Sequence, residues 1–282
     1  MSFPRQVPQI PERSARHELE TDVVYGEVDG VSLRYDHYRP LGASTPAPVV
    51  VVVHGGGWMS GDPSQAAGHG LHFARNGIAT VSISYRLAPA HRFPAALDDV
   101  RRGLRWVRAN AAQLGIDPDR LVLMGLSAGA HLAMLAHLGR DQEALRPELP
   151  AELARVSEEV LGVIAHYGPY DLTRRSGQPD WDPIGQLLGE QGADEAWVRL
   201  ASPAFQAQGA RAPILLIHGT NDDLVSHRES ERMHASLCEA GKRSELLLLD
   251  GAPHAFQMQW RSEANQRANA AMDTFLAQVE II

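Results

Sequence analysis

Residues 49–58 read VVVVVHGGGW, which is five consecutive valines followed by a histidine, three glycines and a tryptophan. Side chains alternate between the two faces of a strand, so a run of five valines predicts a strand that is buried on both faces. The sudden change to His54 and Gly55 predicts that the strand ends there. Such strands are typical of parallel sheets that are covered by helices on both sides.

The alternation of strand and helix continues along most of the 282-residue chain. Further strand-like runs occupy residues 78–85, 121–124, 160–167, 214–218 and 246–249, and helical patterns occupy residues 64–76, 94–114, 127–138, 226–240 and 262–279. A hairpin comes first, with strands over residues 23–28 and 31–38 joined by Asp29-Gly30, which tolerate positive φ. This order predicts a single α/β domain over residues 1–282, with a mainly parallel central sheet and helices on both faces.

Two segments depart from this alternation. Residues 1–22 carry three prolines and many charges, and they predict an N-terminal arm. Residues 171–205 contain Trp181 and Trp197 but no strand-like run, and a connection of this length predicts a lid or cap insertion. We expect both tryptophans, with Trp58 beside the glycines, to wall a substrate-binding pocket. The alternative is that the two insertion tryptophans only pin the insertion to the core.

Composition and charge limit the classes of partner. The chain has 26 Lys and Arg residues against 34 Asp and Glu residues, a formal charge of −8, which argues against nucleic-acid and anionic-membrane partners. No apolar run reaches the roughly 18 residues that a membrane span needs, and the N-terminus has no apolar signal-peptide segment. Cys238 is the only cysteine, so neither an intrachain disulfide nor a cysteine-based metal cluster is expected. These observations favour a cytoplasmic location.

The final helix, residues 262–279, and the strand before it could pair across a two-fold axis, which would form a homodimer.

A candidate nucleophile stands in the motif GLSAG, residues 125–129. The motif lies between a predicted strand and a predicted helix, and this context lifts the hydroxyl of Ser127 above the sheet edge at a helix N-terminus. The flanking glycines avoid the collisions that a Cβ would make in so tight a turn. The backbone N–H groups of two of the three glycines at 55–57, together with that of Ala128, could point at one oxygen and so form an oxyanion hole.

A serine hydroxyl also needs a base, and the base needs an orienting carboxylate. His254 is predicted as the base, because it lies in a loop between the strand at 246–249 and the last helix. His218, His227 and His234 are its competitors. The acid should lie between the serine and the histidine. Asp222 and Asp223 both follow the strand at 214–218, and the residues alone leave the choice between them open.

Six motifs together resemble the α/β-hydrolase fold esterases, and more narrowly their hormone-sensitive-lipase-type and feruloyl/acetyl-xylan-esterase-type branches. These are HGGGW at 54–58, SYRLAP at 84–89, FPAALDDV at 93–100, GLSAGAHLA at 125–133, HGTNDDLV at 218–225 and GAPHAF at 251–256. The resemblance covers residues from about 22 to 280. It implies Ser127 as nucleophile, His254 as base and Asp222 as acid, with Gly56, Gly57 and Ala128 at the oxyanion-hole positions.

Departures from the family pattern refine the expectation. Leu126 stands where hormone-sensitive-lipase-type enzymes usually have Asp or Thr, and Ala130-His131 stands where they have Gly-Asn. The SAGAHLA form is more similar to small-cap esterases and arylformamidases, which argues against a preference for long acyl chains. Arg86 and Asp99 lie in resemblance motifs but are interpreted as a structural ion pair.

The sequence therefore predicts a serine carboxylesterase that hydrolyses short-chain esters through an acyl-enzyme, acts on a small molecule, and needs neither a metal nor an organic cofactor. Two alternatives stay open. The same triad could hydrolyse an amide, as arylformamidases do, because nothing in the motifs encodes the bond. The fold could also serve as a non-enzymatic receptor for a small ligand, although such receptors typically lose the serine or the histidine.

Overall fold

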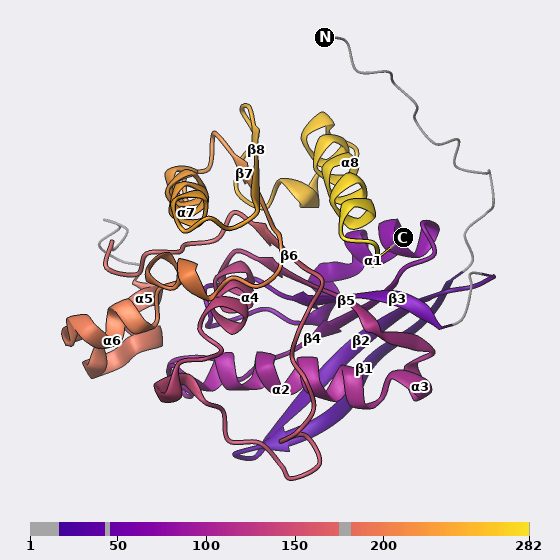
Figure 1. Ribbon diagram of the computed structural model, residues 1–282, viewed down its shortest axis with the longest axis horizontal. Coiled ribbons are helices and arrows are strands. Elements are labelled where there is room, and N and C mark those ends of the chain that lie inside the picture. Colours follow the sequence, from indigo (N-terminus) through magenta and orange to yellow (C-terminus); the bar gives the residue numbers. More distant parts are fainter. Residues whose placement is uncertain (1–16, 43–45, 175–181, 282) are drawn as a thin grey trace.

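One eight-stranded sheet forms the centre of the molecule (Figure 1). The computed structural model of the chain describes residues 17–42, 46–174 and 182–281. The strands are β1 (His17–Val28), β2 (Val31–Pro40), β3 (Ala47–Val53), β4 (Ala79–Ile83), β5 (Ile116–Leu126), β6 (Gly162–His166), β7 (Ile214–Gly219) and β8 (Ser244–Leu249), in the spatial order β1-β2-β4-β3-β5-β6-β7-β8. Only the pairings β1–β2 and β2–β4 are antiparallel. The predicted mainly parallel α/β architecture is therefore confirmed.

Helices cover both faces of this sheet. They are α1 (Ala67–Arg75), α2 (Ala95–Ala109), α3 (Ala111–Leu114), α4 (Ala128–Leu138), α5 (Pro183–Leu188), α6 (Glu195–Leu200), α7 (Arg228–Glu239) and α8 (Glu263–Gln278). Val49, Val51 and Val53 of β3 pack in the core cluster that also holds side chains of α2, α4 and α7. Val50 and Val52 pack in a second cluster with side chains of α1 and α8. All five valines are fully buried, which explains why β3 has no polar position.

The predicted boundaries differ from the structure at three places. β1 begins at His17, so residues 17–22 of the predicted arm lie in a strand, while residues 1–16 fall outside the described residues. This edge strand is held by backbone pairing to β2 and is mostly exposed. Residues 17–22 therefore need no apolar side chains, and the alternation that predicts a strand is missing from them. The predicted helix over 94–114 is divided at Asn110 into α2 and α3. β5 runs from 116 to 126 instead of 121 to 124.

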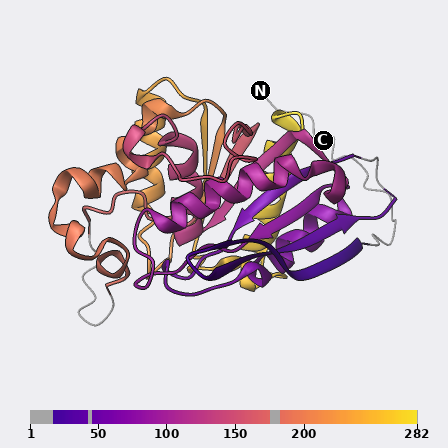
Figure 2. The same cartoon turned by 90° about the horizontal axis from the view of Figure 1, so that it is seen from below.

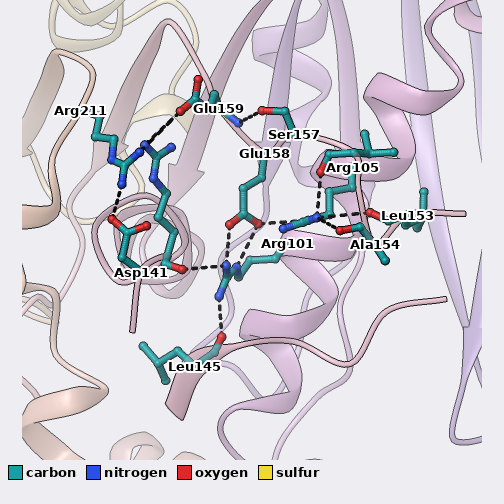
Figure 3. A network of polar contacts seen from close by, with 12 residues as sticks. Arg101, Arg105, Asp141, Leu145, Leu153, Ala154, Ser157, Glu158, Glu159 and Arg211 are labelled. Atoms are coloured by element: carbon teal, nitrogen blue, oxygen red, sulfur yellow. Dashed lines mark hydrogen bonds and ion pairs between the residues drawn. The ribbon is translucent and has the colours of Figure 1, made fainter. Parts of the chain in front are cut away.

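Arginines of α2 hold the irregular connection between α4 and β6 in place (Figure 3). Arg101 donates hydrogen bonds to the carbonyls of Arg140 and Leu145 and forms an ion pair with Glu158. One turn further along α2, Arg105 donates to the carbonyls of residues 153, 154 and 156. The connection lacks regular backbone pairing over most of its length, so these guanidinium groups satisfy carbonyls that a helix or strand would otherwise satisfy.

A second buried ion pair fixes the start of α2 to the end of β4. Arg86 donates to both carboxylate oxygens of Asp99, from Nε at 2.8 Å and from Nη2 at 2.9 Å, and Asp29 at the tip of the β1–β2 hairpin also bonds to this guanidinium. Both Arg86 and Asp99 are buried, and neither lines the cavity described below. Their interpretation as a structural ion pair is therefore confirmed.

The segment between β6 and β7 carries α5 and α6. Figures 1 and 2 both show these two short helices projecting at one end of the molecule. Asp182 caps α5 by accepting from the N–H of Gly185, and Asp194 caps α6 by accepting from the N–H groups of Ala196 and Trp197. The described part of the predicted insertion, residues 171–174 and 182–205, therefore includes two capped helices.

Candidate active site

Ser127 occupies a strained turn between β5 and α4. Its backbone has φ 53° and ψ −116°, a conformation that non-glycine residues rarely adopt. A Cβ at Gly125 would lie 2.2 Å from the carbonyl oxygen of Gly129, and a Cβ at Gly129 would lie 2.2 Å from that of Val53. The N–H of Ser127 donates to the carbonyl of His166 on β6. Two glycines and this hydrogen bond therefore hold the serine in its strained turn.

Two residues that are far from this serine in sequence form one hydrogen-bonded chain with it. The Oγ of Ser127 lies 3.0 Å from Nε2 of His254, and Nδ1 of His254 lies 2.6 Å from Oδ2 of Asp222. The carboxylate can only accept, so Nδ1 carries the proton, and Nε2 is left as the acceptor for the serine hydroxyl. The three side chains come from the ends of β5, β7 and β8, because parallel strands bring their carboxyl ends to one edge of the sheet.

Asp222 is held as an anion. Its Oδ1 accepts from the N–H groups of Leu224 at 2.9 Å and Val225 at 2.8 Å. Burial by itself would raise the pKa of Asp222, but hydrogen bonds from His218, His254 and the N–H of Val225 outweigh it and hold the pKa well below its ordinary value. Asp223, the alternative that the residues left open, is exposed and borders the same cavity as Ser127.

His218 has a position that sequence reasoning missed. It was considered only as a competing base, but it is fully buried and its Nε2 lies 3.2 Å from Oδ2 of Asp222 and 2.9 Å from the carbonyl oxygen of Val225. Its Nδ1 lies 2.7 Å from Oγ of Ser230. His218 and His254 therefore both contact the same carboxylate oxygen, Oδ2 of Asp222. The sequence signal for this contact is the spacing of four residues between His218, near the end of β7, and Asp222.

The glycine-rich loop after β3 turns back beside the serine. Gly56 has φ 115° and Gly57 has φ 60°, and a Cβ at Gly56 would lie 2.1 Å from the carbonyl oxygen of Ser60. Only glycine fits this turn without strain. Gly56, Gly57 and Ala128 border the same cavity as Ser127, so the structure brings all three predicted oxyanion-hole residues to the serine.

Trp58 links this loop to the helix that follows the nucleophile. Its indole N–H donates to Nδ1 of His131 at 3.2 Å, and Nε2 of His131 lies 2.8 Å from the carbonyl oxygen of Ala201, just after α6. Burial lowers the pKa of His131 to about 4, because the charged form would lose its hydration. The neutral ring therefore accepts from the tryptophan and donates to the insertion.

The serine lies in a cavity of about 860 Å³. Besides the triad and the glycine loop, its walls include Trp58, Met59, Tyr167, Asp171, Arg174, Pro183, Ile184, Leu224, Glu229, Arg232, Gln257 and Met258. The insertion thus supplies part of the wall through Asp171, Arg174, Pro183 and Ile184. Trp197 is not one of the lining residues, because its ring packs edge-to-face on Phe93 in the core. Trp181 lies outside the described residues.

Tyr167 is a further wall residue without a sequence signal. Its ring packs on the imidazole of His254 with centroids 4.6 Å apart, and its hydroxyl donates to Gln257. It has φ 40°, which places a bulky residue in the left-handed region at the end of β6.

Within residues 17–42, 46–174 and 182–281, no group of three or more His, Cys, Asp or Glu side chains is arranged to hold a metal ion.

The fold, the strained turn at Ser127 and the hydrogen bonds that join Ser127, His254 and Asp222 are those of an α/β-hydrolase. The chain belongs to the BD-FAE family, whose family model matches residues 35–237. The predicted resemblance to α/β-hydrolase esterases is confirmed by this match and by the relatives described next.

Relatives of known name agree with this assignment. The chain is 31% identical over 275 residues to the esterase LipQ of Mycobacterium tuberculosis, covering 95% of this chain and 64% of LipQ. It is 29% identical to the isoprenylcysteine alpha-carbonyl methylesterase ICME of Arabidopsis thaliana, covering 84% of this chain and 56% of ICME. The chain therefore spans less than two thirds of the length of these relatives.

A solved structure is similar over nearly the whole chain. The propionate-bound thermophilic esterase Est2 of Thermogutta terrifontis matches with a TM-score of 0.76 and 27% identity, covering 98% of this chain and 97% of that chain.

In the part of our chain that the structure describes, no helix has both the length and the apolar character that crossing a membrane requires.

Proposed function

We propose that the chain is a serine carboxylesterase that acts on short-chain esters of small molecules. The observation that carries the proposal is the unbroken chain of hydrogen bonds from Asp222 through His254 to Ser127, at a cavity that also exposes a glycine-rich backbone turn. This arrangement supplies a nucleophile, a base with a fixed tautomer and backbone donors for an oxyanion.

The mechanism follows from the positions of these groups. His254 Nε2 takes the hydroxyl proton as Ser127 Oγ attacks the ester carbonyl, and the resulting oxyanion binds the N–H groups of Gly56, Gly57 and Ala128. The C–O bond to the alcohol breaks while His254 returns the proton to the departing oxygen. Water then attacks the acyl-enzyme by the reverse sequence, which releases the acid and restores the serine.

The relatives support both the reaction and the acyl range. LipQ, NlhH and ICME are named as esterases, and Est2 has been solved with propionate and with butyrate bound. The same Est2 has been solved phosphorylated by paraoxon, an organophosphate. Short acyl groups would leave most of the 860 Å³ cavity for the alcohol portion of the ester.

The first experiment is steady-state hydrolysis of p-nitrophenyl acetate, butyrate, octanoate and laurate. We expect a maximum at acetate or butyrate. We expect Ser127→Ala to lower kcat by roughly 10⁶, as loss of the nucleophile does in another serine hydrolase. Asp222→Asn should lose about 10⁴ in kcat, by analogy with the corresponding change in a serine protease, while Asp223→Asn should keep most of the activity.

Three outcomes would contradict parts of the proposal. A rise in activity toward laurate would overturn the short-chain preference. Turnover of a matched formanilide with none of the ester would indicate an arylformamidase. No turnover of either, together with failure of a fluorophosphonate to label Ser127, would favour the ligand-receptor reading.

A further inference from the structure

A second, smaller cavity adjoins the active-site cavity. It measures about 300 Å³ and lies between the segment after β6 and helix α7. The residues that line both cavities are Asp171, Arg174, Glu229 and Arg232. These four side chains therefore form the wall between the two spaces, and a substrate in the active site can reach them.

The two carboxylates of this shared wall already have partners within the protein. Asp171 accepts from the N–H and the hydroxyl of Thr173 through Oδ1, and from Nε of Arg174 through Oδ2 at 2.7 Å. Glu229 accepts from the N–H groups of Tyr170 and Asp171 through Oε2, and from Nη1 of Arg232 through Oε1 at 3.0 Å. Backbone and arginine donors thus occupy every carboxylate oxygen.

The arginines differ from the carboxylates in exposure. The side chains of Asp171 and Glu229 are 13% and 12% exposed, whereas those of Arg174 and Arg232 are 57% and 46% exposed. A guanidinium has five N–H donors. Each arginine gives one of them to its carboxylate in the contacts above, so a group bound at the wall meets N–H donors rather than carboxylate oxygens.

We propose that Arg174 and Arg232 form a subsite for a carboxylate carried by the substrate, remote from the scissile ester bond. This inference rests on the proposed esterase function and specifies its substrate class as esters that bear an anionic group. A carboxylate accepts two parallel hydrogen bonds from one guanidinium, which matches the donors on the wall. Asp223 lines the active-site cavity but not the second one, so an anion turned toward the second cavity lies away from that charge.

The test compares substrates that differ only in charge. One pair is the mono-p-nitrophenyl ester of adipic acid and the corresponding primary amide, which places the charge on the acyl side. The other pair is the butyrate ester of 3-hydroxybenzoate and that of 3-hydroxybenzamide, which places it on the alcohol side. We expect kcat/KM to favour the acid in at least one pair, and the preference to decline with added salt.

Variants connect that preference to the wall. Arg174→Gln with Arg232→Gln should lower the acid-to-amide ratio of kcat/KM by at least about tenfold, through the KM of the acid. Arg243→Gln is the matched control, since Arg243 is 52% exposed, faces Glu245 and lines neither cavity. Equal kcat/KM for acid and amide in both pairs, or equal losses for both substrates in the double variant, would overturn the subsite.

A binding measurement separates the subsite from the reaction. Calorimetric titration of the Ser127→Ala protein with the same acid and amide needs no turnover. Tighter binding of the acid that disappears in the double arginine variant would support the subsite even if no ester is hydrolysed. Hydrolysis of the ester bond in the amide-bearing substrates, without any preference for the acid-bearing ones, would leave the esterase proposal standing and reject the subsite alone.

Discussion

At the scale of single residues, the candidate site depends on two buried histidines that do not line its cavity. His131 joins Trp58 of the glycine loop to the carbonyl of Ala201 in the insertion, and it does so as a neutral ring buried beneath the nucleophile. His218 contacts the same oxygen of Asp222, Oδ2, as His254 does. Both histidines are positioning residues, because they act through groups that do contact the reacting atoms.

We predict that His131→Leu lowers kcat about tenfold with little change in KM, because the glycine loop loses its anchor and the oxyanion donors are no longer preorganised. Trp58→Phe, which removes only the indole N–H from this link, should have the same kind of effect. The two changes combined should be less than additive in a double-mutant cycle. A fall in thermal stability with unchanged kcat would show that the link only supports the fold.

We predict opposite results for two glycine substitutions. Gly129→Ala should destabilise the protein by about 3 kcal/mol or prevent folding, since its Cβ would lie 2.2 Å from the carbonyl oxygen of Val53. Gly68→Ala, in α1, meets no atom within 4 Å and should be neutral or stabilising by up to about 1 kcal/mol. Urea unfolding of both variants checks this pair, and a well-folded, stable Gly129→Ala would refute the steric account of the elbow.

At the scale of elements, α2 does more than cover the sheet. Its arginines satisfy the carbonyls of the connection between α4 and β6, as Figure 3 shows for Arg101 and Arg105. That connection has few backbone hydrogen bonds of its own, so its order depends on α2. The same helix is fixed to β4 by the buried pair of Arg86 and Asp99.

We predict that Arg101→Met destabilises the protein by about 3 kcal/mol. Glu158 would keep only the longer contact to Arg105 at 3.4 Å, and the carbonyls of Arg140 and Leu145 would lose their donor. Hydrogen exchange in residues 139–161 should accelerate more than in the sheet. The matched control is Arg102→Met, whose guanidinium donates to the carbonyl of Glu148 at an exposed position. Equal effects of the two substitutions would contradict a specific role for Arg101.

At the scale of the whole molecule, the described residues include many buried neutral histidines. Burial lowers the pKa of five of them to about 4, namely His37, His54, His69, His131 and His137, and lowers that of His166 well below its ordinary value. In the unfolded chain these groups titrate near pH 6.5. The unfolded state therefore binds more protons than the folded state below that pH.

We predict that the free energy of unfolding is greatest above pH 6.5 and falls steadily as the pH drops toward 4. The sign follows because protonation of these rings requires exposure, which favours the unfolded state. Urea titrations at several pH values measure the slope, which should correspond to an uptake of several protons. His137→Gln should reduce the uptake by about one proton. A stability that is flat between pH 6.5 and 4 would contradict this account.

Sequence by itself determined the local features of this protein, and tertiary structure decided the rest. Five valines specify a doubly buried strand, and GLSAG specifies an elbow, because the physical causes lie within a few neighbouring residues. The hydrogen bond between His254 and Asp222, the packing of Trp197 against the core and the positions of His218 and Tyr167 depend on segments that only folding brings together. The wall of Arg174 and Arg232 likewise joins the insertion to α7, and no spacing along the chain encodes that contact.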